Sequence, residues 1–147
     1  MIPLEISNLL GSRLAIYLSN EDIVLRLLSK DASHIELSEL GFTDHELKIY
    51  KECVKKPNGI ILISGPTGSG KTTTLYATLK NINNDSTNIL TIEDPIEYTL
   101  EGVNQVQLKE NIGLDFVSTL RTFLRQDPDV IMVGEIRDAK TANMGIR

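Results

Sequence analysis

The sequence predicts an α/β fold with a mainly parallel sheet and flanking helices. Short apolar runs, typical of strands buried on both faces, alternate with longer segments whose apolar residues recur at helical spacing. This alternation predicts parallel strands that are joined by helices. A glycine-rich turn between one apolar run and one helical segment adds a third observation, because such turns cradle anions at the edge of a sheet.

The N-terminal part of the chain predicts a small β-rich piece. Residues 12–18 and 22–28 are rich in Leu, Ile and Val, and the polar residues 19–21 between them suit a hairpin. A polar connection follows. The expected division is therefore the end of a small N-terminal domain over 1–30, a linker over 31–42, and a partial main domain over 43–147.

The main domain begins with a helix signal. Thr43 and Glu46 have the spacing of a capping box, which predicts a helix to about Lys56. The apolar run 59–64 predicts a buried strand, and the helical spacing of 70–82 predicts a helix directly after it. The other predicted elements are strands at 89–92, 103–108 and 130–133, and helices over 115–126 and from Asp138 onward.

Composition narrows the function classes. The net charge of −5 argues against nucleic acid as the main partner, because phosphate-binding surfaces are usually basic. The single cysteine, Cys53, excludes an intramolecular disulfide, fits a reducing cytoplasm and is expected to be partly buried. There is no basic leader, and no apolar run reaches the roughly 18 residues of a membrane helix, so any membrane role is expected to act through a partner.

Residues 65–72, GPTGSGKT, match the P-loop pattern. Glycines let the backbone turn tightly and point successive N–H groups at one anion, and the following helix adds the positive end of its dipole. Lys71 would bring a cation to the β- and γ-phosphates, and Thr72 would offer a hydroxyl to Mg²⁺. The alternative is a glycine-rich strand-to-helix turn that binds nothing.

Acidic residues follow two of the predicted strands. Glu135 comes at the end of the apolar run 130–133, where a carboxylate can hold Mg²⁺ through water; the alternative is a helix-capping or solvated carboxylate. Glu93, Asp94 and Glu97 lie within five residues and would repel one another without a cation. A polar loop without a ligand is the alternative here.

As a set, three stretches resemble the secretion ATPase superfamily, which serves type II secretion and type IV pilus assembly. The resemblance is nearly continuous from about Ile23 to Arg147, and the stretches that carry it are ISGPTGSGKTTTLYATL, ILTIEDPIEYTLEGVNQVQ and GLDFVSTLRTFLRQDPDVIMVGEIRDAKTAN.

The resemblance implies a RecA-like ATPase with ATP and Mg²⁺ as ligands. It implies Lys71, Glu97, Glu135 and Arg26 as catalytic residues, with Glu97 positioning the attacking water and Arg26 reaching the γ-phosphate as an arginine finger. The implied metal residues are Thr72, Glu135 and Glu93. The implied nucleotide-binding loop consists of Gly65, Pro66, Thr67, Gly68, Ser69, Gly70, Lys71, Thr72 and Thr73.

The resemblance also implies a homo-hexamer at the cytoplasmic face of the inner membrane, where it would drive a membrane platform protein. Two departures qualify this. Arg13 is out of register with a second family arginine, and the chain stops at Arg147, before the family's histidine box and further strands. We therefore expect a fragment of a longer protein, inactive alone. Two alternatives stay open: an assembly module that binds nucleotide without turnover, and a RecA-like nucleic-acid translocase, which the net acidity disfavours.

Overall fold

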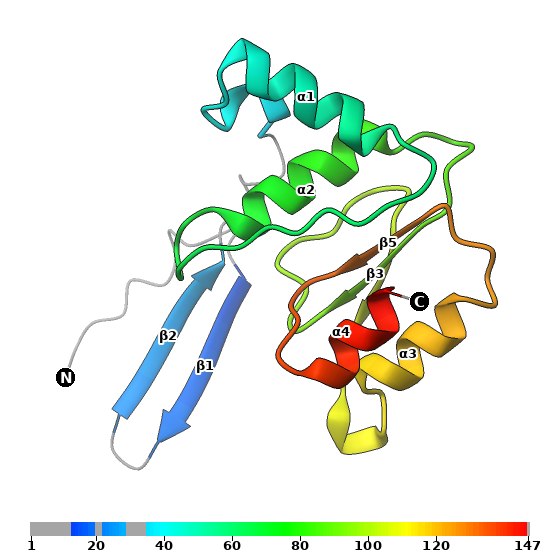
Figure 1. Ribbon diagram of the computed structural model, residues 1–147. Coiled ribbons are helices and arrows are strands. Elements are labelled where there is room, and N and C mark those ends of the chain that lie inside the picture. Colours follow the sequence, from blue (N-terminus) through cyan, green and yellow to red (C-terminus); the bar gives the residue numbers. More distant parts are fainter. Residues whose placement is uncertain (1–12, 20–21, 29–34, 147) are drawn as a thin grey trace. The chain divides into compact units, whose positions relative to one another are not determined.

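The computed structural model describes residues 13–19, 22–28 and 35–146, and the chain divides into two compact units, Met1–His34 and Ile35–Arg147 (Figure 1). In the first unit, β1 (Arg13–Ser19) and β2 (Asp22–Leu28) pair antiparallel. Arg13 lies opposite Leu28 and Ser19 opposite Asp22. The predicted pair of strands is confirmed, and the turn between them lies outside the described residues.

The second unit contains a three-stranded parallel sheet. Its order is β4 (Asn104–Gln107), β3 (Ile89–Glu93), β5 (Val130–Val133), with β3 in the centre. All five residues of β3 are buried, the polar Thr91 and Glu93 among them, because a central strand is covered on both faces. The predicted parallel sheet is thereby confirmed for these three strands.

Helices cover both faces of this sheet (Figure 1). Helix α2 (Lys71–Ile82) packs on one face, α3 (Phe116–Phe123) packs on the other, and α4 (Ala139–Ile146) lies beside α3. Alternate residues of β3 point to opposite faces and build two cores. The core beneath α2 contains Tyr76, Leu79, Ile89, Leu100 and Met132, and the core beneath α3 contains Leu90, Ile92, Leu108, Leu120 and Phe123.

Helix α1 (Asp44–Val54) begins at the predicted capping box. The Glu46 amide donates to the Thr43 hydroxyl at 3.3 Å, and the Thr43 amide donates to the Glu46 carboxylate at 2.9 Å. None of the described residues of α1 is buried, so the stability of this helix depends more on its cap and on contacts at its edge than on burial in a core. One such contact joins the Tyr50 hydroxyl to the Thr78 hydroxyl of α2 at 2.8 Å.

Two short 3-10 helices complete the second unit, η3 (Leu37–Glu39) and η4 (Glu110–Ile112). Leu37 is buried, and Glu36 before it forms an ion pair of 2.6 Å with Lys80 of α2. Across the described ranges, no helix is both long and apolar enough to cross a bilayer.

The predicted strand over 59–64 is wrong. Residues 59–65 form no strand, and Ile60, Ile61 and Leu62 are 56%, 43% and 76% exposed. A strand requires a hydrogen-bonded neighbour as well as an apolar sequence. Both sides of β3 are already occupied by β4 and β5, and this segment pairs with neither of those strands within the described chain.

Two smaller expectations also need correction. Helix α3 ends at Phe123 rather than at Gln126, because the last residues tighten into a turn in which the Gln126 amide donates to the Phe123 carbonyl at 2.9 Å. Cys53 is exposed rather than partly buried, since α1 presents that side to solvent.

Candidate functional site

The glycine loop before α2 has backbone geometry that only glycine adopts readily. Gly68 and Gly70 have φ angles of 80° and 87°, in the left-handed region that costs other residues energy. At Gly65 a Cβ atom would come within 2.6 Å of the Ser69 Oγ atom. The Ser69 amide closes the turn by donating to the Pro66 carbonyl at 3.2 Å. The loop is therefore a backbone cradle in which Gly65 avoids crowding against Ser69, whereas Gly68 and Gly70 serve through their left-handed conformation.

The first turn of α2 supplies the positive side of this cradle. Gly70 is the N-cap, and no side chain caps the helix. The first main-chain hydrogen bond of the helix runs from the Thr74 amide to the Gly70 carbonyl at 2.9 Å. The amides of residues 71–73 therefore have no acceptor within the helix. Unpaired amides together with the helix dipole favour an anion at this end.

Lys71 folds over the loop that precedes it. Its Nζ atom donates to the carbonyl oxygens of Gly65 and Pro66, each at 2.8 Å. An ammonium group has three protons, so one remains for a further acceptor. The cradle, the helix end and this ammonium fit a phosphate chain. Thr72 is exposed beside them, where its hydroxyl is accessible to a cation.

The carboxyl ends of β3 and β5 meet at one edge of the sheet. The Gly134 amide donates to the Ile92 carbonyl at 2.8 Å, and a Cβ atom at Gly134 would lie only 3.2 Å from that oxygen. Glycine therefore lets the two strand ends approach closely. The acidic residues that follow each strand, Asp94 and Glu135, are brought to the same edge.

Arg137 bridges these two acidic residues. Its guanidinium lies 2.5 Å from Glu135 Oε1 and 3.7 Å from Asp94 Oδ2. The Glu135 Oε1 atom is buried and makes no hydrogen bond of good geometry within the described structure, so the ion pair is its compensation. Arg137 was not among the residues expected at the site, although its place two residues after Glu135 was a signal.

Glu93, expected at the metal, is 3% exposed and faces α2. The Tyr76 hydroxyl donates to Glu93 Oε2, while the Thr91 hydroxyl and the Gln105 side-chain amide donate to Oε1 at 2.5 and 3.1 Å. Burial, the hydrogen bond to Glu93 and its charge raise the pKa of Tyr76 far above the ordinary value. The phenol therefore keeps its proton and acts as a donor.

Glu97 lies on the loop after β3 and is half-buried. Its backbone amide donates to the Tyr76 hydroxyl at 3.3 Å. Tyr76, Thr91 and Gln105 were not among the residues expected at the site. A signal for them existed, because Thr91 and Glu93 alternate in an otherwise apolar strand and must share one face.

Arg26 lies on β2 opposite Ala15, and its side chain belongs to the part of the chain that is not described. Among the described residues, no group of three or more His, Cys, Asp or Glu side chains gathers as a metal site. Thr72, Glu93 and Glu135 as metal residues therefore stay predictions.

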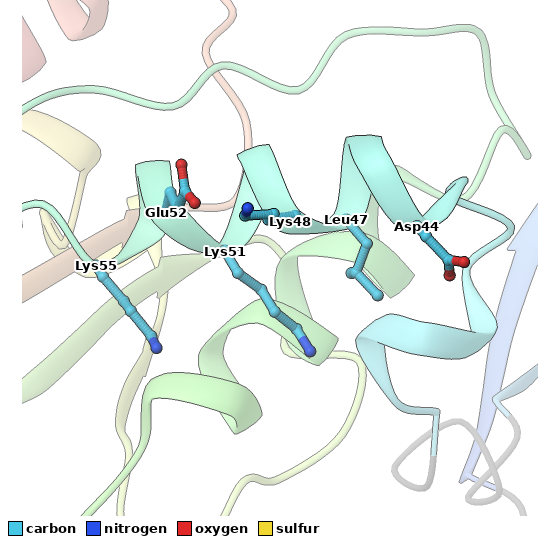
Figure 2. A pocket seen from close by; sticks show the side chains of 6 residues that line it. All are labelled: Asp44, Leu47, Lys48, Lys51, Glu52 and Lys55. Atoms are coloured by element: carbon cyan, nitrogen blue, oxygen red, sulfur yellow. The ribbon is translucent and has the colours of Figure 1, made fainter.

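One hollow on the surface of the described residues lies on α1 and not at the cradle. It measures about 380 Å³ and is lined by five residues of α1 and by Lys55 directly after it, shown in Figure 2. Asp44, Leu47, Lys51 and Lys55 project from one side of the helix (Figure 2). The lining carries charges of both signs and includes none of the residues expected at the site, so this hollow supports no catalytic role.

Fold and cradle together define the class: an α/β protein with a P-loop at the N-terminus of a helix. The family described as type II/IV secretion system protein matches residues 4–147, and the chain belongs to this family. The resemblance inferred from the sequence is thus confirmed.

The chain is 51% identical over 130 residues to the type IV pilus assembly ATPase PilB of Myxococcus xanthus. It is 55% identical over 127 residues to the type II secretion system protein E of Aeromonas hydrophila. The alignments cover 88% and 86% of this chain but only 23% and 25% of those proteins, so the chain spans about a quarter of their length.

A solved structure is also similar. The crystal structure of the pilus retraction motor PilT with bound ADP matches with a TM-score of 0.72 and 34% sequence identity. The match covers all of this chain and 47% of that one.

Proposed function

We propose that this chain is the nucleotide-binding part of a motor ATPase of a type II secretion or type IV pilus assembly system. The observation that carries the proposal is the cradle of residues 65–70, closed over by Lys71 at the open end of α2. A chain of phosphates complements amides, a helix dipole and an ammonium, and ATP is the ligand that the named relatives imply.

In this proposal each residue has one task. The cradle amides and Lys71 hold the β- and γ-phosphates, and Lys71 balances charge that grows on the transferred group. Thr72 and Glu135 are the candidate holders of Mg²⁺, whose chemistry is to neutralise the phosphate oxygens. Glu97 orients the attacking water. Glu93 at the metal and Arg26 at the γ-phosphate stay predictions.

The working assembly in this proposal is a homo-hexamer at the cytoplasmic face of the inner membrane. There it would drive a membrane platform protein, with hydrolysis of ATP to ADP and phosphate as the source of work.

Titration with a fluorescent ATP analogue in the presence of Mg²⁺ tests the cradle. Lys71→Ala should abolish tight binding, because it removes the only ammonium that contacts the described loop. Lys48→Ala removes the same charge from an exposed position on α1 and should bind like the unchanged chain. Tight binding by the Lys71 variant would refute the assignment.

A nucleotide-binding module without turnover is the second candidate. It is favoured by the ion pair of Glu135 with Arg137, which engages a carboxylate that turnover would need. Steady-state release of phosphate separates the two functions. Turnover by the isolated chain would exclude the module, and tight binding without release would support it.

A further inference from the structure

A buried chain of hydrogen bonds joins helix α2 to the acidic loop after β3. The Tyr76 hydroxyl donates to the Glu93 carboxylate and accepts a hydrogen bond from the Glu97 amide at 3.3 Å. Tyr76 and Glu93 are 1% and 3% exposed, so water does not compete with these bonds. The helix that starts at the cradle is therefore connected to the backbone of Glu97 through the protein interior.

The Glu93 carboxylate is itself held in place. Thr91 and Gln105 occupy one of its oxygens, which leaves the other to face α2. Gln105 also binds the loop directly, since its side-chain amide donates to the Tyr98 carbonyl at 3.2 Å and its oxygen accepts from the Leu100 amide at 2.7 Å. Strand and loop thus form a rigid acceptor for a single hydroxyl from the helix.

We propose that Tyr76 is a positioning residue: its hydroxyl, oriented by Glu93, holds the backbone of Glu97 at a fixed place relative to the helix that carries Lys71. Tyr76 touches no nucleotide in this arrangement and acts through the residue that it holds. We call the hydrogen bonds from Glu93 through the Tyr76 hydroxyl to the Glu97 amide the tether. Its role in catalysis rests on the proposed function, in which Glu97 orients the attacking water. The hydrogen bonds themselves do not depend on that function. In this arrangement both oxygens of the Glu93 carboxylate accept hydrogen bonds from protein groups.

Nuclear magnetic resonance of the whole chain tests the tether with three matched variants. Tyr76→Phe removes the hydroxyl. Tyr98→Phe removes a hydroxyl that makes no hydrogen bond within the described structure, from a ring whose centroid lies 4.1 Å from that of Tyr76. Thr91→Val removes a bond to the same carboxylate without touching Glu97.

The Glu97 amide should respond to one variant alone. In Tyr76→Phe its resonance should shift and its hydrogen exchange should accelerate about tenfold, the effect of losing one hydrogen bond. Tyr98→Phe should leave both unchanged. Thr91→Val should lower overall stability yet leave the Glu97 exchange close to its original rate, which separates positioning from a general loss of stability.

Affinity for Mg²⁺ and ATP in the same variants completes the test. The affinity of Tyr76→Phe for ATP should stay within about threefold of that of the unchanged chain. The reason is that the cradle lies before the first residue of α2, whereas Tyr76 lies further along the helix. A large loss of affinity, or equal acceleration of Glu97 exchange in the Tyr76 and Thr91 variants, would overturn the proposal. Failure of the unchanged chain to bind ATP would refute the proposed function and leave the amide result standing.

If Tyr76→Phe does not fold, a measurement on the unchanged chain still tests the tether. The tether requires a slowly exchanging Tyr76 hydroxyl proton with a nuclear Overhauser effect to the Glu97 amide proton. The absence of that signal, with both resonances assigned, would overturn the proposal.

Discussion

Replacing Gly70 with alanine tests whether the cradle depends on backbone conformation alone. Gly70 has a φ angle of 87°, and a Cβ atom added there would meet no heavy atom within 4 Å. Crowding therefore contributes nothing, and the cost is that of a left-handed conformation, about 1–2 kcal/mol for a residue other than glycine. Gly41, before α1, is a matched control, because its φ angle is 84° and its surroundings are equally open.

Urea denaturation measures the cost, and titration with Mg²⁺ and ATP measures its consequence. Both alanine variants should lose about 1–2 kcal/mol of unfolding free energy. Only Gly70→Ala should lose nucleotide affinity, by about tenfold or more, since a relaxed loop turns its amides away from the phosphates. Unchanged stability in Gly70→Ala would refute the conformational argument. Equal affinity loss in both variants would refute the assignment of the loop.

Four further predictions concern the surrounding fold. Thr43→Ala removes the cap of α1 and should cost about 1 kcal/mol in urea denaturation. Ile92→Ala opens a cavity at a residue that is 0% exposed and should cost about 2–5 kcal/mol. Ile112→Ala, at a residue that is 71% exposed, should change stability by less than about 0.5 kcal/mol in the same assay. Burial, followed by the charge of Glu93, raises the pKa of Tyr98 to about 12, so the folded state favours the neutral phenol. This preference should contribute fully to stability below about pH 10, and the contribution should disappear as the pH rises through about 12. In an absorbance titration of tyrosinate formation, loss of the late step in Tyr98→Phe would identify Tyr98 as the group.

Elements that depend on neighbouring residues in the sequence were predictable. The capping box at Thr43 marks the start of α1, and the apolar run 130–133 has the bounds of β5. The spacing of glycines and lysine in 65–72 predicted the cradle, because that function uses consecutive backbone groups.

Features that depend on distant partners were not predictable. Residues 59–64 have the composition of a strand, but the sheet leaves them without a described neighbour. Glu93 looked like one of several loop acids, yet the alternation of β3 turns it inward toward Tyr76. Alternation in the sequence predicts the face of a strand on which a side chain lies. Which side chain it contacts there is decided by the tertiary fold.

The place of Gly134 has a mechanical consequence for the two acidic loops. Main-chain atoms alone clamp the ends of β3 and β5 together, with an amide of one against a carbonyl of the other at 2.8 Å. The strength of this main-chain hydrogen bond does not depend on ionic strength or on the protonation of nearby side chains. The separation of Asp94 and Glu135 is therefore set by the sheet, and the guanidinium of Arg137, which pairs with both carboxylates, balances their charges at that separation.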